Sequence, residues 1–202
     1  MSAHIDRFVM DRLPPAARQA QMLRDLPELH FPDQLNLVQE LLDRADEKGW
    51  GDRPLLRSPR ITLSYRDARE RVDRIAQVLV HDLGLVPGNR VLLRGGNSIG
   101  LALAWMGVVK AGMVAVATMP LLRAKELKQI IDKAQISHAL CDVSLWQEIG
   151  NVTNPNGEHY APSLLRAAYF NESEDGGLEE MIESKPATFT ACDTAADDVA
   201  LI

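Results

Sequence analysis

Cysteine is scarce in this sequence, and its scarcity limits the kinds of site that the chain can build. Two cysteines occur among 202 residues, Cys141 and Cys192, and they lie far apart. No CxxC pair and no pair of histidines at metal-ligand spacing is present, so the sequence predicts no metal site. Neither cysteine has an activating neighbour. We therefore expect two buried or incidental thiols, as is usual in a reducing cytoplasm.

The chain also has no excess of positive charge and no long uninterrupted apolar run. Its formal net charge is -6, so neither a nucleic-acid partner nor a membrane surface is predicted. The longest mainly apolar stretch, LALAWMGVVKAGMVAVATMPLL, is interrupted by two glycines, a lysine and a proline, which favours a helix, a turn and a strand over a membrane span. The first residues contain charges and a proline pair instead of a secretory signal. These features predict a soluble cytoplasmic protein.

Two nucleotide-binding fingerprints are missing from the one glycine-rich segment that invites them, GGNSIG at residues 95–100. A phosphate loop of the Walker type needs Lys-Ser or Lys-Thr after the last glycine, whereas Leu101 and Ala102 follow here. The dinucleotide pattern needs Gly-x-Gly, which is also absent. We expect a structural turn in which Asn97 caps the next helix. A ligand near that helix start is the alternative.

The sequence does contain a regular alternation of strand-like and helix-like segments. Its clearest helix has apolar residues at three- and four-residue spacing from Ala68 to Leu83, opposed by arginines and acids that predict a solvated face. The predicted elements are a helix at 35–48, a hairpin at 54–57 and 60–63, a helix ending at Gly84, a strand at 90–94, a helix at 98–111, a strand at 113–118, a helix at 123–134 and a strand at 136–142.

The alternation predicts an α/β fold with a doubly wound, mostly parallel sheet and flanking helices. Farther along, the pattern predicts one or two helical turns at 144–150, a loop at 151–163, an edge strand at 167–170, a short helix at 177–185 and a strand at 199–202. Residues 171–202 contain nine acidic residues and one base, Lys185. We expect this acidic stretch to form a solvated linker and loop region.

The most unusual connection is the segment of residues 118–122, here called the 118–122 loop. It leaves a buried strand and enters a helix, and it contains Thr118, Met119, Pro120, Leu121 and Leu122. Open α/β sheets bind ligands just beyond the carboxyl ends of their strands, so this loop is the predicted site. The alternative is an ordinary strand-to-helix connection. The five histidines are scattered and specify no catalytic triad, and His138 is predicted to be a satisfied core residue.

Several of these segments together resemble a known family. The resemblance extends over about residues 30–202 and depends on a Ser-Tyr before an amphipathic helix, a Pro-Gly turn before an apolar strand, and a Lys-Ala-Gly at a helix end. This arrangement is similar to the N-terminal region of the adenylate-forming acid ligases, the acyl- and aryl-CoA synthetases. The segments DRLPPAARQ, DLPELHFPDQLNLVQELLDRADEKGWGDRPLLR and ATMPLLRA resemble the 2-aminobenzoate and benzoate CoA ligases.

The resemblance implies a reaction and a division of the chain. Such enzymes join a carboxylic acid to AMP from ATP with Mg²⁺, release pyrophosphate, and transfer the acyl group to CoA. Residues 1–34 would be an N-terminal leader and 35–202 the N-terminal part of the adenylation domain. DDVALI at 197–202 resembles the strand that precedes the phosphate-binding loop. The partners would be the aryl carboxylate, ATP and CoA.

The resemblance carries no catalytic residue onto this chain. The family's phosphate-binding loop, aryl-binding segment, ribose-binding acid and catalytic lysine have no counterpart in these 202 residues. We therefore expect an N-terminal fragment that is inactive by itself and binds no cofactor tightly. In relatives, the segment that corresponds to the 118–122 loop approaches the CoA tunnel, so its five residues are candidate tunnel residues.

Two other functions fit parts of the sequence. A non-catalytic module that binds acyl-CoA or a protein partner would need no catalytic motif. A nicotinamide-dependent Rossmann dehydrogenase would share the alternation of strands and helices, but the glycine fingerprint that it requires is absent.

Overall fold

The centre of the molecule is a parallel four-stranded sheet. The computed structural model describes residues 1–202 except 22, 24 and 172–176. The strands follow the order β4-β3-β5-β6, and each neighbouring pair is parallel. Their bounds are β3 Arg90–Arg94, β4 Val114–Thr118, β5 His138–Asp142 and β6 Arg166–Phe170. The predicted parallel sheet is confirmed, with β6 at one edge as expected for residues 167–170.

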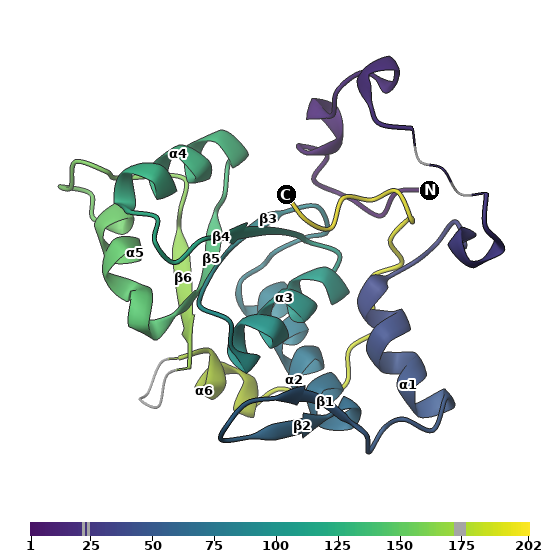
Figure 1. Ribbon diagram of the computed structural model, residues 1–202. Helices are drawn as coiled ribbons and strands as arrows, with labels where there is room; N and C mark the ends of the chain where they lie inside the picture. The colour runs from purple at the N-terminus through teal and green to yellow at the C-terminus, as the bar shows by residue number, and fades with distance from the viewer. Residues whose placement is uncertain (22, 24, 172–176) are drawn as a thin grey trace.

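Helices cover both faces of this sheet (Figure 1). On one face, α2 (Tyr65–Gln77) and α3 (Ile99–Lys110) share a core with alternate strand residues such as Val91 and Leu93. On the other, α4 (Ala124–Ala134) and α5 (Trp146–Thr153) pack over Leu92. Successive strand residues point to opposite faces, so continuously apolar strands supply two cores. This arrangement confirms the predicted doubly wound α/β architecture.

Shorter elements complete the fold. The predicted hairpin exists as β1 (Pro54–Arg57) and β2 (Thr62–Ser64), which pair antiparallel. Gly49 and Gly84 end the first two predicted helices with positive φ values of 68° and 64°, as left-handed helix caps do. The other elements are η1 Met10–Arg12, η2 Ala16–Arg18, η3 Pro27–Leu29, η4 Gln39–Asp43, α1 Arg44–Glu47, η5 Val78–Asp82, η6 Val143–Leu145 and α6 Leu178–Glu183.

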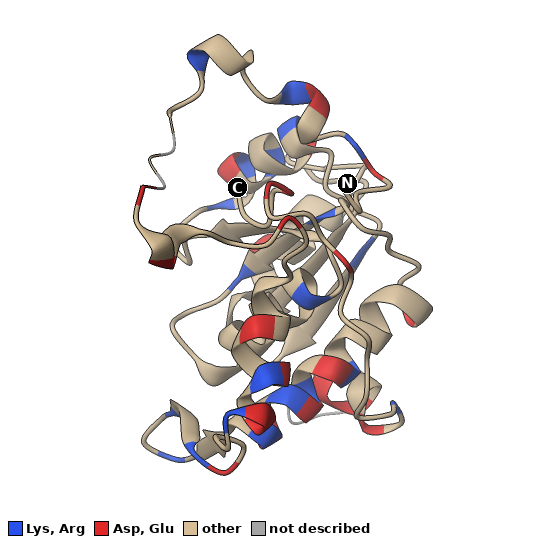
Figure 2. Ribbon diagram, turned by 90° about the vertical axis from the view of Figure 1, so that its right-hand side faces the viewer, with Lys and Arg blue, Asp and Glu red and all other residues tan. Residues whose placement is uncertain are grey.

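Charged residues are interleaved around α1, α2 and the hairpin, in the lower part of Figure 2. Asp46 pairs with Arg69 at 2.5 Å, and Arg66 pairs with Asp52. Exposed pairs of this kind stabilise a protein little. Most of the predicted polar helix face is exposed or partly exposed, but the prediction is wrong for Asp73, which is buried against Lys110.

Two local predictions are wrong. Ser98, and not Asn97, caps α3: its backbone is extended, and its Oγ accepts the Leu101 N–H at 3.2 Å. The cap must be the last non-helical residue, and the helix starts one residue later than predicted. The loop predicted at 151–163 begins instead at Asn154, because α5 continues through Thr153.

The acidic C-terminal stretch forms a loop after α6, as predicted, but the predicted solvated linker is wrong for the described part of 171–202. Phe189 and Ala200 pack against the core, and the Cys192 N–H donates to the Lys110 carbonyl at 2.9 Å. The predicted strand at 199–202 is reduced to an isolated parallel bridge between Leu201 and Ala115 on β4. Apolar residues spaced among the acids hold the segment on the protein.

The N-terminal residues also contact the sheet layer. The N–H groups of Ile5 and Asp6 both donate to the Pro87 carbonyl at 3.0 Å, and Asp6 forms an ion pair with Arg90. His4 and Val9 are buried. The division between a leader at 1–34 and a domain at 35–202 stays a prediction.

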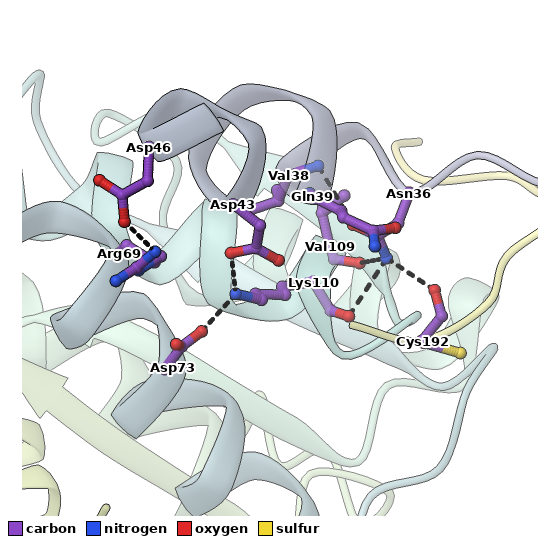
Figure 3. Close-up of polar contacts among 10 residues, drawn as sticks. All are labelled: Asn36, Val38, Gln39, Asp43, Asp46, Arg69, Asp73, Val109, Lys110 and Cys192. Atoms are coloured by element: carbon purple, nitrogen blue, oxygen red, sulfur yellow. Dashed lines mark hydrogen bonds and ion pairs between the residues drawn. The ribbon is translucent and has the colours of Figure 1, made fainter. Parts of the chain in front are cut away.

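A buried ammonium group joins three segments of the fold (Figure 3). Lys110 Nζ, at the end of α3, donates to Asp43 at 2.6 Å and also contacts Asp73 of α2. The Lys110 and Asp73 side chains are only 1% and 6% exposed. Burial raises the pKa of Asp73, against the opposite effect of Lys110. A buried charge needs such partners, because its removal from water is costly.

Asn36 extends this network to the C-terminal segment. Its Nδ2 donates to the carbonyls of Val109, Lys110 and Cys192 at 3.1–3.2 Å. Its Oδ1 accepts the Val38 N–H at 3.1 Å. The end of α3, the start of the first helical segment and the C-terminal stretch therefore meet at one point.

Replacing the buried ammonium group tests this junction. Lys110→Met leaves two carboxylates without their cation, so we expect it to lower the free energy of unfolding by about 3–5 kcal/mol. Lys128→Met is the matched control, because Lys128 pairs with Asp132 at 2.5 Å on an exposed helix face; it should cost less than about 1 kcal/mol. Urea unfolding of the chain measures both. Equal losses would contradict a special role for Lys110.

Candidate active-site edge

The four parallel strands end along one edge of the sheet. Their last residues are Arg94, Thr118, Asp142 and Phe170. Ligands of open α/β proteins bind beyond the carboxyl ends of the strands, where loops and helix starts converge. The predicted 118–122 loop lies at this edge.

Arg94 holds the 118–122 loop by its backbone. Its Nη1 donates to the Met119 carbonyl at 3.0 Å, and its Nη2 donates to the Pro120 and Leu122 carbonyls at 2.9 and 2.8 Å. Thr118 Oγ1 donates to the Leu93 carbonyl at 3.1 Å. The Arg94 residue is 1% exposed, and burial lowers the pKa of its guanidinium.

The fixed backbone leaves apolar side chains in solvent. Met119 and Leu121 are 62% and 80% exposed, whereas Leu122 packs against the α4/α5 core. The structure thus divides the five predicted residues. Thr118 and Leu122 anchor the loop, Pro120 contributes a carbonyl, and Met119 and Leu121 are free to touch a ligand.

Glu148 of α5 holds the other end of the same connection. Its carboxylate accepts from Arg123 Nη1 at 3.0 Å and from the Ala124 N–H at 2.8 Å. Arg123 is the N-cap residue of α4, and its own N–H donates to Glu126 at 3.0 Å. The first turn of a helix has unpaired N–H groups, and these two carboxylates satisfy two of them.

The rest of the edge is closed by a polar network. Asp142 accepts from Asn171 Nδ2 at 2.6 Å and from Ser144 Oγ at 2.6 Å. Asn171 has a φ of 60°, and its Nδ2 also lies 3.3 Å from Ser98 Oγ. These groups satisfy one another and connect the ends of β5 and β6 to the start of α3.

Two of the three glycines of GGNSIG are explained by packing against the end of β6. A Cβ at Gly100 would lie 2.5 Å from Asn171 Oδ1, and one at Gly95 would lie 2.9 Å from the Phe170 ring. Only glycine fits such close approaches. These contacts support the structural turn over a phosphate-binding loop.

An apolar groove of about 350 Å³ lies beside the edge. Apolar hollows of this size suit a small organic group. A larger groove, of about 620 Å³, lies instead beside Asp43, Asp73 and residues 187–190, and its surface is more polar. The smaller groove is lined by Leu41, Leu55, Leu56, Leu93, Asn97, Ser98, Leu101, Ala102, Trp105, Met106 and Ala117.

The profile of the AMP-binding enzyme family matches residues 43–202. The chain belongs to this family. A salicyl-AMP ligase / salicyl-S-ArCP synthetase of Mycobacterium tuberculosis is 40% identical over 97 residues, which are 48% of this chain and 14% of the relative. A long-chain-fatty-acid–CoA ligase of Salmonella typhimurium is 31% identical over 104 residues, 52% of this chain and 18% of the relative.

Solved structures show the same fold. The anthranilate CoA ligase AuaEII in complex with anthranoyl-AMP superposes with a TM-score of 0.74 at 20% identity, over 85% of this chain and 31% of that chain. Apo MatB from Rhodopseudomonas palustris gives 0.69 at 24% identity, over 83% and 31%. This member of the AMP-binding family therefore spans about a third or less of the length of these relatives.

No metal centre is built by the described residues of this AMP-binding family member. Among them, no group of three His, Cys, Asp or Glu side chains could hold a metal ion. The described residues do not fit Mg²⁺ bound to ATP, because they offer neither a carboxylate cluster nor a glycine loop free to hold phosphates. No helix in the described part of the chain is long and apolar enough to cross a bilayer.

The structure shows the surroundings of the two cysteines and of His138, for which the sequence predicts no catalytic role. Cys141 is buried, and burial raises the pKa of its thiol to about 12. Burial also raises the pKa of Cys192. His138 is half-buried, with Nδ1 2.9 Å from Ser137 Oγ, and burial lowers its pKa. Thiols with raised pKa values are poor nucleophiles at neutral pH.

Sequence reasoning missed Arg94 and Glu148. The sequence pattern places Arg94 only in a strand and Glu148 only in a short helix. An arginine at the end of an otherwise apolar buried strand is the one available signal, because burial of a charge requires a specific set of partners. Glu148 leaves no such signal, since it meets the start of α4 only in the folded chain.

The Glu148 anchor predicts an acid-dependent release of the connection. The hydrogen bond from Arg123, followed by that from the Ala124 N–H, lowers the pKa of Glu148 despite desolvation. A lowered carboxyl pKa contributes stability above the unfolded value, about 4.3, which is lost as the pH falls through the folded value. NMR titration of the Glu148 carboxyl carbon should give a midpoint below that of the unfolded chain. Glu148→Gln should remove this part of the acid dependence; a midpoint at or above the unfolded value would contradict the anchor.

Proposed function

We propose that residues 1–202 are the N-terminal part of an AMP-forming ligase that activates an aromatic carboxylic acid, 2-aminobenzoate or benzoate, and transfers it to CoA. The observation that carries the proposal is the match to the AMP-binding enzyme family over residues 43–202. ATP and CoA would be the other reactants of the whole protein, and Mg²⁺ would be its cofactor. The acyl group would leave AMP when the CoA thiol attacks the adenylate carbonyl.

Two comparisons support an aromatic acid. One relative is named for salicylate, and one structural neighbour is an anthranilate CoA ligase with anthranoyl-AMP. Other relatives are named for long-chain fatty acids. The ATMPLLRA segment, which resembles the 2-aminobenzoate ligases, forms the end of β4 and the anchored loop after it.

The edge of the sheet supports a binding role for the 118–122 loop. Met119 and Leu121 present apolar surface from a backbone held at three carbonyls. Such preorganised contacts reduce the entropy lost when a ligand binds. We assign these two side chains to the path of CoA, and the apolar groove beside Leu93 and Trp105 to an apolar part of the substrates.

The first test concerns the isolated chain. Because the described residues do not fit Mg²⁺ and ATP phosphates, we expect the 202-residue chain to catalyse no ATP–pyrophosphate exchange with any aryl acid. Exchange of labelled pyrophosphate into ATP measures this half-reaction. Robust exchange by the purified chain would overturn the assignment of the chemistry to residues outside it.

The complementary test uses the whole gene product that contains residues 1–202. It should form an aryl-CoA thioester with a kcat/KM for 2-aminobenzoate or benzoate above that for decanoate by roughly tenfold or more. Release of AMP and formation of the thioester measure the reaction. Preference for decanoate would contradict the aromatic assignment. Tight acyl-CoA binding without turnover would favour a non-catalytic binding module.

A further inference from the structure

Strand β3 has a buried arginine at each end. Arg90 begins the strand and is 5% exposed, and Arg94 ends it and is 1% exposed. Both guanidinium groups donate to backbone carbonyls of the connections around them. Arg90 lies at the amino edge of the sheet and Arg94 at the carboxyl edge.

Arg90 closes the amino edge and has a counter-charge. Its Nε and Nη2 donate to the carbonyls of Ala134 and Gln135 at 2.8 and 2.9 Å. Its Nη1 forms an ion pair with Asp6. Ligands of parallel α/β sheets do not bind at this edge, so these contacts stabilise the fold.

Arg94 has no carboxylate partner among its described hydrogen bonds. All three bonds go to carbonyls of the 118–122 loop, and in the described residues its buried Nε has no hydrogen-bond partner. Burying a cation in this way is costly. An apolar residue would fill the end of a buried strand more cheaply, so the arginine is explained by what it does to the loop.

Thr118 and Leu122 anchor the two ends of the loop, and between them few other contacts of the described residues define its conformation. Pro120 has no N–H, and the Leu122 N–H donates to the Met119 carbonyl at 3.2 Å. The side chains of Met119 and Leu121 are mostly in solvent. The direction in which these two side chains project therefore depends on the three carbonyls that Arg94 holds.

We propose that Arg94 is a positioning residue of the ligase reaction, which fixes the 118–122 loop so that Met119 and Leu121 contact CoA. The proposal rests on the proposed function, since it assigns the loop to the CoA path. Arginine suits the task because its planar fork reaches several carbonyls at once. A lysine keeps the charge but cannot reproduce this geometry.

The kinetic experiment compares Arg94→Lys with Arg90→Lys in the whole gene product. Arg94→Lys should raise the KM for CoA by roughly tenfold, the loss expected from about one charge-assisted hydrogen bond, and leave ATP–pyrophosphate exchange unchanged. Arg90→Lys should lower the Tm without raising the KM for CoA relative to that for ATP. Equal effects of the two variants on the KM for CoA, or equal loss of both half-reactions in Arg94→Lys, would overturn the proposal.

A second pair of variants leaves the core intact. Leu121→Ala removes one of the presented side chains, and Leu165→Ala is its match because Leu165 is 75% exposed near the amino end of β6. Leu121→Ala should raise the KM for CoA several-fold, because the apolar surface that CoA would cover is lost. The Tm should not change, because Leu121 is exposed in the absence of CoA. Leu165→Ala should change neither quantity. An unchanged KM for CoA in Leu121→Ala would also overturn the proposal.

Hydrogen exchange separates the positioning role from the proposed function. In the 202-residue chain, Arg94→Lys should speed amide exchange at residues 119 and 121–124, whereas Arg90→Lys should not. If the wild-type gene product forms no thioester, the proposed function fails, and this measurement still decides whether Arg94 fixes the loop. Unchanged exchange in Arg94→Lys would show that it does not.

Discussion

The arrangement of the helices depends on the ion pairs that the Lys110 ammonium group forms with Asp43 and Asp73. Lys110 comes from the end of α3, its side chain is only 1% exposed, and it meets carboxylates from η4 and α2. A buried ammonium group tolerates little displacement of its partners, because moving one of them away leaves its charge uncompensated. The same residue's carbonyl accepts from Asn36 and from the Cys192 N–H. One position therefore sets the place of three helical segments and of the C-terminal stretch.

Buried charged side chains also lie at the two ends of β3, where Arg90 and Arg94 bind backbone carbonyls. The strand is apolar between its two arginines, and its side chains alternate between the two cores. Arg90 and Arg94 then close the two edges of the layer by binding carbonyls of the neighbouring connections. These carbonyls lie at the end of α4 and in the 118–122 loop, and the arginines supply hydrogen-bond donors to them. At the amino edge this satisfies the backbone, and at the carboxyl edge it also shapes a surface that a ligand can reach.

The strands of the central sheet and the helices that pack on it are predicted by periodicity, whereas the strand predicted at 199–202 is only an isolated bridge. The stripe from Ala68 and the apolar strands were recognisable because burial on one or two faces leaves a repeating pattern. The place of the 118–122 loop followed from a rule about parallel sheets. Long-range polar contacts leave no such pattern, so Arg94 and Glu148 could not be paired with their partners in advance. The acidic composition of the C-terminal stretch predicts solvation on average, but it does not show that single apolar residues such as Phe189 pack against the core.

The position of Asp198 in the DDVALI motif is explained by hydrogen bonds within this fold. It precedes the apolar VALI and belongs to the segment that resembles the approach to a phosphate-binding loop. In the fold it accepts the N–H groups of Ala3 and Ala195 at 2.9 Å each. Burial opposes ionisation, but these hydrogen bonds and others lower the pKa of Asp198 overall. The charge holds the N-terminal residues beside the turn before Ala200, whose carbonyl accepts from Ala115 of β4. The acid therefore sets the direction in which the chain meets the sheet, which explains its place before an apolar segment without any contact to a ligand.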